Sequence, residues 1–196
     1  MNDLMDISSY PTKNFVLKHK DIDVLSFSFN QKYEIVKINE IKDERHIPIG
    51  VNNNENMSLI EALQDWWKHR TIPASRNNLE QGLEKLNIKI TAELLEKSYG
   101  LSLTDHYWIC PEGINLKWQK INYYENRFSA DIGKILFDNH IISEREVNFF
   151  SPDNSSDGNL QKKWIIEKDG TRSLIKGGDI FSPQESFELT PNFRTV

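Results

Sequence analysis

Residues 21–41, DIDVLSFSFNQKYEIVKINEI, contain the pattern that decides the fold class. Apolar and polar side chains alternate over Leu25–Asn30, and a period of two is typical of a strand with one buried face. The segment Tyr33–Ile41 (YEIVKINEI) predicts a second strand directly after it. Upstream, Asn14–Lys20 predicts another short strand, which comes after a polar leader over residues 1–13.

The chain then changes from strand periodicity to helix periodicity. A charged, Asn-rich stretch over 43–56 contains Pro48 and Gly50 and predicts a loop. Ser58 and Glu61 have the spacing of a capping box, in which each side chain bonds the other residue's backbone N–H, so we expect a helix from Ser58 to about Arg70. Two further helices are expected, one over 75–86 capped by Ser75 and one over 91–100 ended by Gly100.

The second half of the chain predicts a hairpin after a layer rich in aromatic residues. Leu101–Ile109 and Leu116–Tyr124 are dense in Tyr and Trp, and we expect them to connect the helices with the C-terminal part of the chain. Ser129–Phe137 predicts a short helix. From Ser151 the composition becomes small and polar, and then the segments 164–166 (WII) and 173–176 (SLIK) flank the turn residues 168–171.

This order of elements predicts an α+β protein. We expect a mixed strand-and-helix region over 14–145, a smaller region with an antiparallel hairpin over 146–187, and a separate tail over 188–196.

Composition narrows the classes of function. The net charge of −5 does not favour nucleic acid as the main partner, because contacts to phosphate come from Lys and Arg. No apolar run approaches the roughly 20 residues that cross a bilayer, and the N-terminus MNDLMDISSYPTKN does not resemble a secretory signal. The single cysteine, Cys110, excludes an internal disulfide, so we expect a cytoplasmic protein.

The histidines do not predict a metal site. All five are scattered along the sequence, without the i, i+4 or clustered spacing of zinc ligands. We therefore expect no metal bound by histidine.

The stretch Ser151–Gly178 carries the clearest chemical pattern. It contains a loop of small polar residues, a strand, a tight turn, and a strand that ends in Lys176. The ATP-binding lobe of protein kinases has this order, with a loop over the phosphates and a strand lysine that reaches them. Lys176 has the same strand parity as Leu174, so one face of the strand could offer both an apolar surface and a cation.

Several phrases of the sequence, in one order over residues 14–187, resemble the HipA-like serine/threonine kinases of Gram-positive bacteria. They are DWW (65–67), RTIPASR (70–76), LLEKSYGLSL (94–103), DHYWICPEG (105–113), LKW (116–118), SPDNSSDG (151–158), LIKGG (174–178) and QE (184–185).

The resemblance implies specific roles. The phosphate loop would consist of Asn154, Ser155, Ser156, Asp157 and Gly158, and Lys176 would be the nucleotide-binding lysine. Ser155 or Ser156 would be a self-inhibitory phosphorylation site. Residues 146–187 would form part of a kinase N-lobe, with ATP and Mg²⁺ as family cofactors that bind weakly or not at all here. The family's Gln-Glu phrase matches Gln184-Glu185, but the role of Glu185 stays open.

The end of the chain departs from the family pattern. After Phe187 the sequence reads ELTPNFRTV, and Pro191 would break the helix that the family has there. In the family, the catalytic aspartate and the metal ligands belong to a helical lobe on the C-terminal side of this helix. The resemblance therefore implies a truncated kinase fragment of toxin–antitoxin type. We expect it to be inactive alone or to depend on a partner, either a separate kinase C-lobe or an antitoxin protein.

Two other functions remain open at this point. One is a stand-alone regulatory or binding module. The other is a helix-turn-helix DNA-binding protein, formed by the helices predicted over 58–70 and 75–86, with Lys68, Arg70 and Arg76 near the turn. The acidic total charge and the apolar residues of both helices favour packing over DNA binding.

Overall fold

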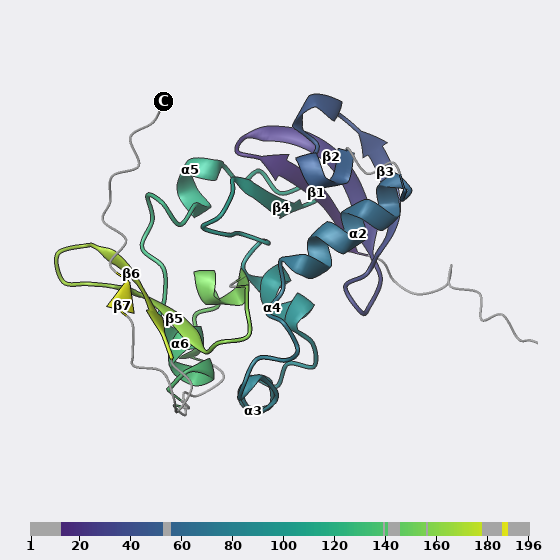
Figure 1. Ribbon diagram of the computed structural model, residues 1–196. Coiled ribbons are helices and arrows are strands. Elements are labelled where there is room, and N and C mark those ends of the chain that lie inside the picture. The colour runs from purple at the N-terminus through teal and green to yellow at the C-terminus, as the bar shows by residue number, and fades with distance from the viewer. Residues whose placement is uncertain are drawn as a thin grey trace, which may run out of the picture.

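The computed structural model describes residues 13–52, 56–138, 140, 146–155 and 157–177, together with the backbone of residues 186–187. The fold is α+β, as the sequence predicts (Figure 1). Residues 1–12 of the predicted leader and the tail over 188–196 lie outside the described residues, and Lys13, which the leader was predicted to include, already belongs to β1. None of the described helices is both long and apolar enough to cross a membrane.

A four-stranded antiparallel sheet forms the first part of the fold. Its strands are β1 (Lys13–His19), β2 (Ile22–Phe29), β3 (Ile35–Ile41) and β4 (Tyr107–Pro111), in the order β3-β2-β1-β4. The three strands predicted from the N-terminal sequence are confirmed. Leu25, Phe27 and Phe29 are 0–1% exposed, as the alternation predicted, but Ser26 and Ser28 between them are only 5% exposed, so both faces of β2 are covered at this point.

Strand β4 corrects the sequence analysis, which treated residues 101–109 as a connecting layer. Tyr107–Pro111 pairs antiparallel with β1, and His19 lies opposite Tyr107. The strand is buried without alternation from Trp108 to Cys110, and its partner is remote in sequence. A period-two pattern therefore could not reveal it.

Helix α2 (Leu59–His69) packs across the sheet (Figure 1). Its predicted capping box is present, because the Ser58 backbone N–H donates to Glu61 Oε2 at 2.8 Å and the Glu61 N–H donates to Ser58 Oγ at 3.4 Å. Leu63 and Trp67, each 1% exposed, form its inward face.

Smaller helices surround this layer, and several of them differ from prediction. The 43–56 loop contains the 3-10 helix η2 (Glu44–His46) and helix α1 (Ile49–Asn52). Helix α3 (Leu79–Lys85) begins later than predicted, because Ser75 does not cap it and instead donates a hydrogen bond to Asn159 Oδ1 at 2.6 Å. The other helices are α4 (Thr91–Lys97), α5 (Trp118–Ile121), α6 (Asp131–Leu136) and the 3-10 helix η4 (Pro152–Ser155).

A second sheet contains the predicted hairpin. Strands β5 (Lys162–Ile166) and β6 (Arg172–Lys176) pair antiparallel, and β7 (Ser186–Phe187) adds to β6. The turn between β5 and β6 places Gly170 at φ +92°, a backbone conformation that favours glycine.

The hairpin shares a hydrophobic core with the rest of the chain. Trp164 and Ile166 of β5 pack against a buried cluster that contains Trp108, Trp118 and Tyr123. This shared core fixes the hairpin relative to the residues that face it.

Candidate functional site

A pocket of about 430 Å³ lies between the hairpin and the first part of the fold. One wall comes from β5, β6 and the loop after η4, and the other comes from the end of α2 and the segment before β4. The lining residues are Trp66, His69, Arg70, Ser102, Leu103, Thr104, Asp105, Pro152, Ser155, Asp157, Lys162, Trp164, Leu174 and Lys176.

One face of the hairpin presents two cross-strand pairs to this pocket. Lys162 lies opposite Lys176, and Trp164 lies opposite Leu174. Like charges directly opposite each other on a sheet are unfavourable. The hairpin therefore places a pair of cations beside an apolar pair, in an arrangement that a bound anion would stabilise.

The electrostatics of Lys162 agree with this view. Burial lowers the pKa of the Lys162 ammonium, the positive charges of Arg76 and Lys176 lower it further, and Asp157 opposes them. The ammonium donates a hydrogen bond to the backbone carbonyl of Asp157. A phosphate or another anion near Lys162 would favour its charged form.

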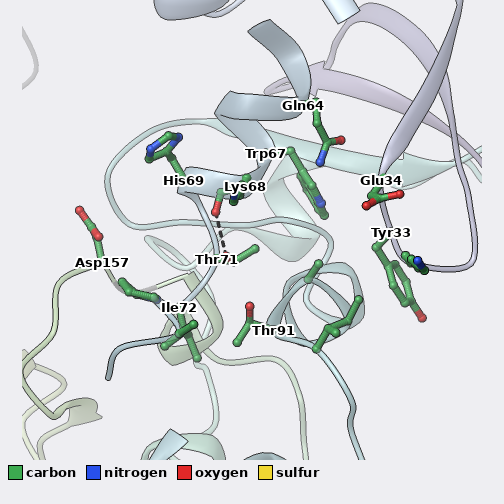
Figure 2. A pocket seen from close by; sticks show the side chains of 15 residues that line it. Tyr33, Glu34, Gln64, Trp67, Lys68, His69, Thr71, Ile72, Thr91 and Asp157 are labelled. Atoms are coloured by element: carbon green, nitrogen blue, oxygen red, sulfur yellow. Dashed lines mark hydrogen bonds between the residues drawn. The ribbon is translucent and has the colours of Figure 1, made fainter. Parts of the chain in front are cut away.

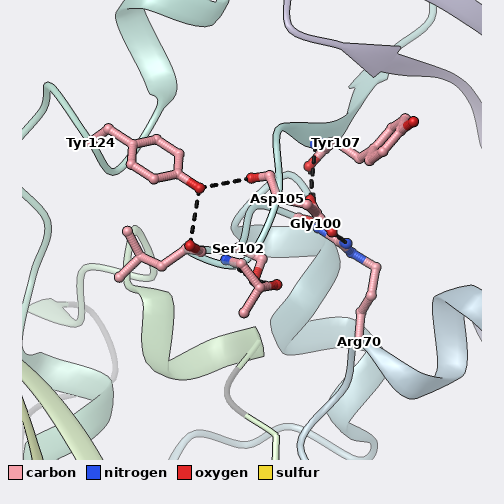
Figure 3. A network of polar contacts seen from close by, with 8 residues as sticks. Arg70, Gly100, Ser102, Asp105, Tyr107 and Tyr124 are labelled. Carbon is pink, nitrogen blue, oxygen red and sulfur yellow. Dashed lines mark hydrogen bonds and ion pairs between the residues drawn. The ribbon is translucent and has the colours of Figure 1, made fainter. Parts of the chain in front are cut away.

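The opposite wall is held by a polar network around Arg70 (Figure 3). Its guanidinium forms an ion pair with Asp105 and donates to the carbonyls of Gly100 at 2.8 Å and Tyr107 at 3.2 Å. It also lies 4.4 Å from the ring centroid of Trp66. These contacts fix the end of α2 against the segment that leads into β4.

Tyr124 completes the network from the other side. Its hydroxyl lies 3.0 Å from the carbonyl oxygens of both Leu103 and Asp105, as Figure 3 shows. Burial, with a smaller contribution from Asp105, raises the pKa of Tyr124 to about 12, so its hydroxyl remains a donor at neutral pH.

The predicted phosphate-loop residues take different places. Ser155 and Asp157 line the pocket together with Lys176. Asn154 is fully buried, and its amide donates to the Phe149 carbonyl at 2.6 Å. Gly158, at φ +88°, is not among the lining residues. Ser156 and Glu185 lie outside the described residues.

Arg76 fixes the end of this loop. Its Nε and Nη2 atoms donate to the Gly158 carbonyl at 3.1 and 2.8 Å. This contact ties the segment before α3 to the loop that precedes the hairpin.

Asp153 is a buried residue whose importance the sequence did not reveal. Its carboxylate accepts the Trp164 backbone N–H at 2.9 Å and the Ser151 hydroxyl at 3.1 Å, and it is 1% exposed. Burial raises the pKa of Asp153 to about 7, although these hydrogen bonds and Arg76 act in the opposite direction. Asp153 thus attaches η4 to β5 and positions the loop beside the pocket.

Lys162 and Trp164 were also missed. Both could have been found by extending the predicted hairpin register, which places them opposite Lys176 and Leu174.

Three histidines that are distant in sequence lie close together. His19 and His46 have their Nδ1 atoms 2.8 Å apart, and the rings of His19 and His106 are 6.2 Å apart. Even so, among the described residues no three His, Cys, Asp or Glu side chains have an arrangement that could hold a metal ion.

Comparison with known proteins adds no assignment: no family model matches the chain, and neither a curated protein nor a solved structure matches it.

Proposed function

We propose that the chain is the nucleotide-binding part of a HipA-like serine/threonine kinase. The observation that carries this proposal is the hairpin face on which the pair Lys162 and Lys176 lies beside the pair Trp164 and Leu174. A nucleotide has two corresponding parts, because its phosphate chain is anionic and its base is uncharged.

In this proposal the two lysines bind the phosphates, and Trp164 and Leu174 contact the base or the sugar. Kinases use a strand lysine and a covering loop in this way, because phosphoryl groups must be held by cations and by N–H donors. Ser155 and Asp157 border the same pocket and are thus close enough to take part in the loop's role.

The position of the resembling phrases supports the proposal. Trp66, Arg70 and Asp105 belong to three of these phrases and line one wall of the pocket. Ser155 and Lys176 belong to two others and line the opposite wall. Segments distant in sequence that carry the resemblance therefore meet at one pocket.

The proposal includes a partner. The resemblance assigns the catalytic aspartate and the Mg²⁺ ligands to a helical lobe beyond the region of resemblance, so we propose that this chain works with a kinase C-lobe or is controlled by an antitoxin protein in the cytoplasm. Ser155 is the described candidate for self-inhibitory phosphorylation.

Isothermal calorimetry with ATP tests the nucleotide assignment. Removing Lys176 by Lys176→Ala should weaken ATP binding by about tenfold or more, because a hydrogen bond to a charged group contributes about 1.5–3 kcal/mol. Lys162→Ala should act in the same direction. Lys168→Ala is the matched control, because it removes the same charge from the hairpin turn, outside the pocket lining.

Adenosine, which has no phosphates, tests binding of the base and sugar apart from binding of the phosphates. It should bind more weakly than ATP, and Lys176→Ala should leave its affinity unchanged. Equal ATP affinity in the wild type and in Lys176→Ala would show that this pocket does not bind the phosphates.

A further inference from the structure

A pair of histidine rings joins the 3-10 helix η2 to the first sheet. His46 is the last residue of η2, and His19 is the last residue of β1. Their Nδ1 atoms lie 2.8 Å apart, within hydrogen-bonding distance of each other. At the other end of η2, the backbone N–H groups of Lys42 and Asp43 donate to the Val24 carbonyl at 2.8 and 3.0 Å. The histidine pair thus attaches η2 to β1, and the backbone bonds attach it to β2.

The ring of His19 is held in place by the sheet. It stacks on Tyr107 of β4, with ring centroids 4.7 Å apart and an interplanar angle of 22°. Tyr107 is fixed in turn, because its backbone N–H donates to Asp105 Oδ1 at 2.9 Å and its carbonyl accepts from Arg70 at 3.2 Å (Figure 3). A separation of the two histidine rings would therefore displace His46 and η2 rather than His19.

The protonation state of the pair decides whether this contact is attractive. A hydrogen bond between two ring nitrogens needs an N–H on one ring and a lone pair on the other. Two neutral rings meet this need, and so does a pair in which one ring is a cation. When both rings are cations, both Nδ1 atoms carry a proton, so the bond is lost and two like charges face each other. The contact thus withstands the first proton but not the second.

Charges around His19 oppose a second proton. Burial is the first cause that lowers the pKa of the His19 imidazole, and three groups that can carry positive charge follow. They are His46 of η2, His106 before β4 and Lys20 after β1. Asp105 acts in the opposite direction, but its carboxylate already forms an ion pair with Arg70. On β2, the residue opposite His19 is the apolar Ile22.

The charges beside His46 are also engaged. Asp43, whose carboxyl pKa is lowered first by Arg45 and to a smaller degree by His46, forms an ion pair with Arg45 at 2.8 Å. Glu44 of η2 is exposed, so solvent screens its charge. Asp105 and Asp43 therefore each have an arginine partner already, and they compensate a second proton on the pair only weakly.

We propose that His19 and His46 form an acid-sensitive latch, which holds η2 on the sheet at neutral pH and opens when both rings are protonated. Both rings are only partly buried, so protons from solvent reach them. Opening releases η2 from β1, while Val51 of α1, at 3% exposed, keeps the next turn of the chain in the core. Neither histidine lines the first pocket, so the latch does not depend on nucleotide binding.

Native-state hydrogen exchange of η2 tests this latch. The reporters are the backbone amides of His46 and Ile47, which close the 3-10 turn. Their protection factors, corrected for intrinsic exchange at each pH, should fall by about tenfold or more between about pH 7.5 and about pH 4.5, because a hydrogen bond is replaced by repulsion. The amide of Gly100, which donates to the Leu95 carbonyl at 2.8 Å, is the internal reference and should not lose protection.

His46→Asn separates the charge of residue 46 from its hydrogen bond. An asparagine amide oxygen can accept from the Nδ1–H of His19 whether His19 is neutral or charged, so protection of η2 should stay nearly constant over the same pH range. His69→Ala is the control. It removes a histidine that is 75% exposed at the end of α2, beside a second pocket of about 420 Å³ (Figure 2), and should behave as the wild type does.

The latch is overturned if η2 of the wild type keeps its protection at acid pH. It is also overturned if His46→Asn loses protection as the wild type does, since the second charge would then not be the cause. If His46→Asn does not fold, ¹H–¹³C correlation spectra of the imidazoles of the wild type decide. His19 and His46 should then titrate in two coupled steps, and independent titration of the two rings would contradict the latch.

Discussion

At the scale of single residues, Asp153 links folding to pH. Its pKa is raised to about 7 in the folded chain, so the folded state keeps this proton to a higher pH than the unfolded state does. The stabilisation that results is complete below the unfolded pKa of about 4 and is lost as the pH rises through 7. One such proton contributes a slope of at most about 1.4 kcal/mol per pH unit.

We therefore expect Asp153→Asn to remove part of the decrease in stability between about pH 4 and pH 7, as measured by urea denaturation at each pH. The pH dependence of stability contributed by His19 runs in the opposite direction, because burial and then His46 lower the pKa of His19. The stabilisation from His19 is lost as the pH falls below about 6.5. The difference between variant and wild type at each pH isolates Asp153. A constant difference across this range would contradict the assignment.

Arg70 gives a second prediction at this scale. Its side chain is 7% exposed and pairs with Asp105, so Arg70→Gln leaves a partly buried carboxylate without its main cation. We expect a loss on the order of 3 kcal/mol in the free energy of unfolding, measured by urea denaturation.

The control for Arg70 is Arg45→Gln, because the ion pair of Arg45 with Asp43 is on the surface and the Arg45 side chain is 85% exposed. Its effect should be far smaller than that of Arg70→Gln. Equal effects of the two substitutions would mean that the network in Figure 3 does not hold the two segments together.

At the scale of elements, the end of α4 depends on Gly100. This residue has φ +64°, and an added Cβ would lie 2.9 Å from the Trp67 ring. Gly100→Ala should cost about 1–2 kcal/mol for the left-handed backbone, and about 1–3 kcal/mol more for the clash. Gly113→Ala is the control, because it has φ +82° and no atom near its added Cβ. Thermal denaturation should separate the two; equal shifts would argue against this packing of Trp67.

The elements that could be predicted are those whose information is local. Strand β2 is indicated by alternation, the start of α2 by Ser58 and Glu61, and the hairpin by its turn. Strand β4 depends on pairing with a strand remote in sequence, and the late start of α3 depends on a contact between Ser75 and Asn159. No local pattern contains either of these contacts.

In the candidate sites, too, local sequence predicts some residues and the contacts of the folded chain determine others. Lys176, Ser155 and Asp157 were selected from one continuous stretch, and the structure places them at one pocket. The contacts of Asp153 with β5 and the grouping of His19 with His46 require the folded chain.

At the scale of the whole molecule, charge and burial together bear on DNA binding. The net charge is −5, and Arg70 and Arg76, at 8% and 6% exposed, point into contacts within the chain. We expect duplex affinity no tighter than the non-specific range of roughly 10⁻⁴–10⁻⁶ M at physiological salt, measured by fluorescence anisotropy. Submicromolar binding to a defined site, with a steep dependence on salt, would support a helix-turn-helix function instead.

The last prediction concerns what the 196-residue chain does with ATP when it is purified alone. Phosphoryl transfer depends on positioning the reactants and on stabilising the developing charge with Mg²⁺. It also needs an aspartate that accepts the hydroxyl proton and residues that hold the metal. Near the first pocket, Asp105 is engaged by Arg70, and in the proposed function the catalytic carboxylates come from a partner lobe. We therefore expect ATP to bind without transfer of labelled γ-phosphate to Ser155 or to water above a buffer control. Incorporation that disappears in Lys176→Ala would show that these residues already form a complete kinase site, whereas incorporation that persists in Lys176→Ala would point to a contaminating kinase.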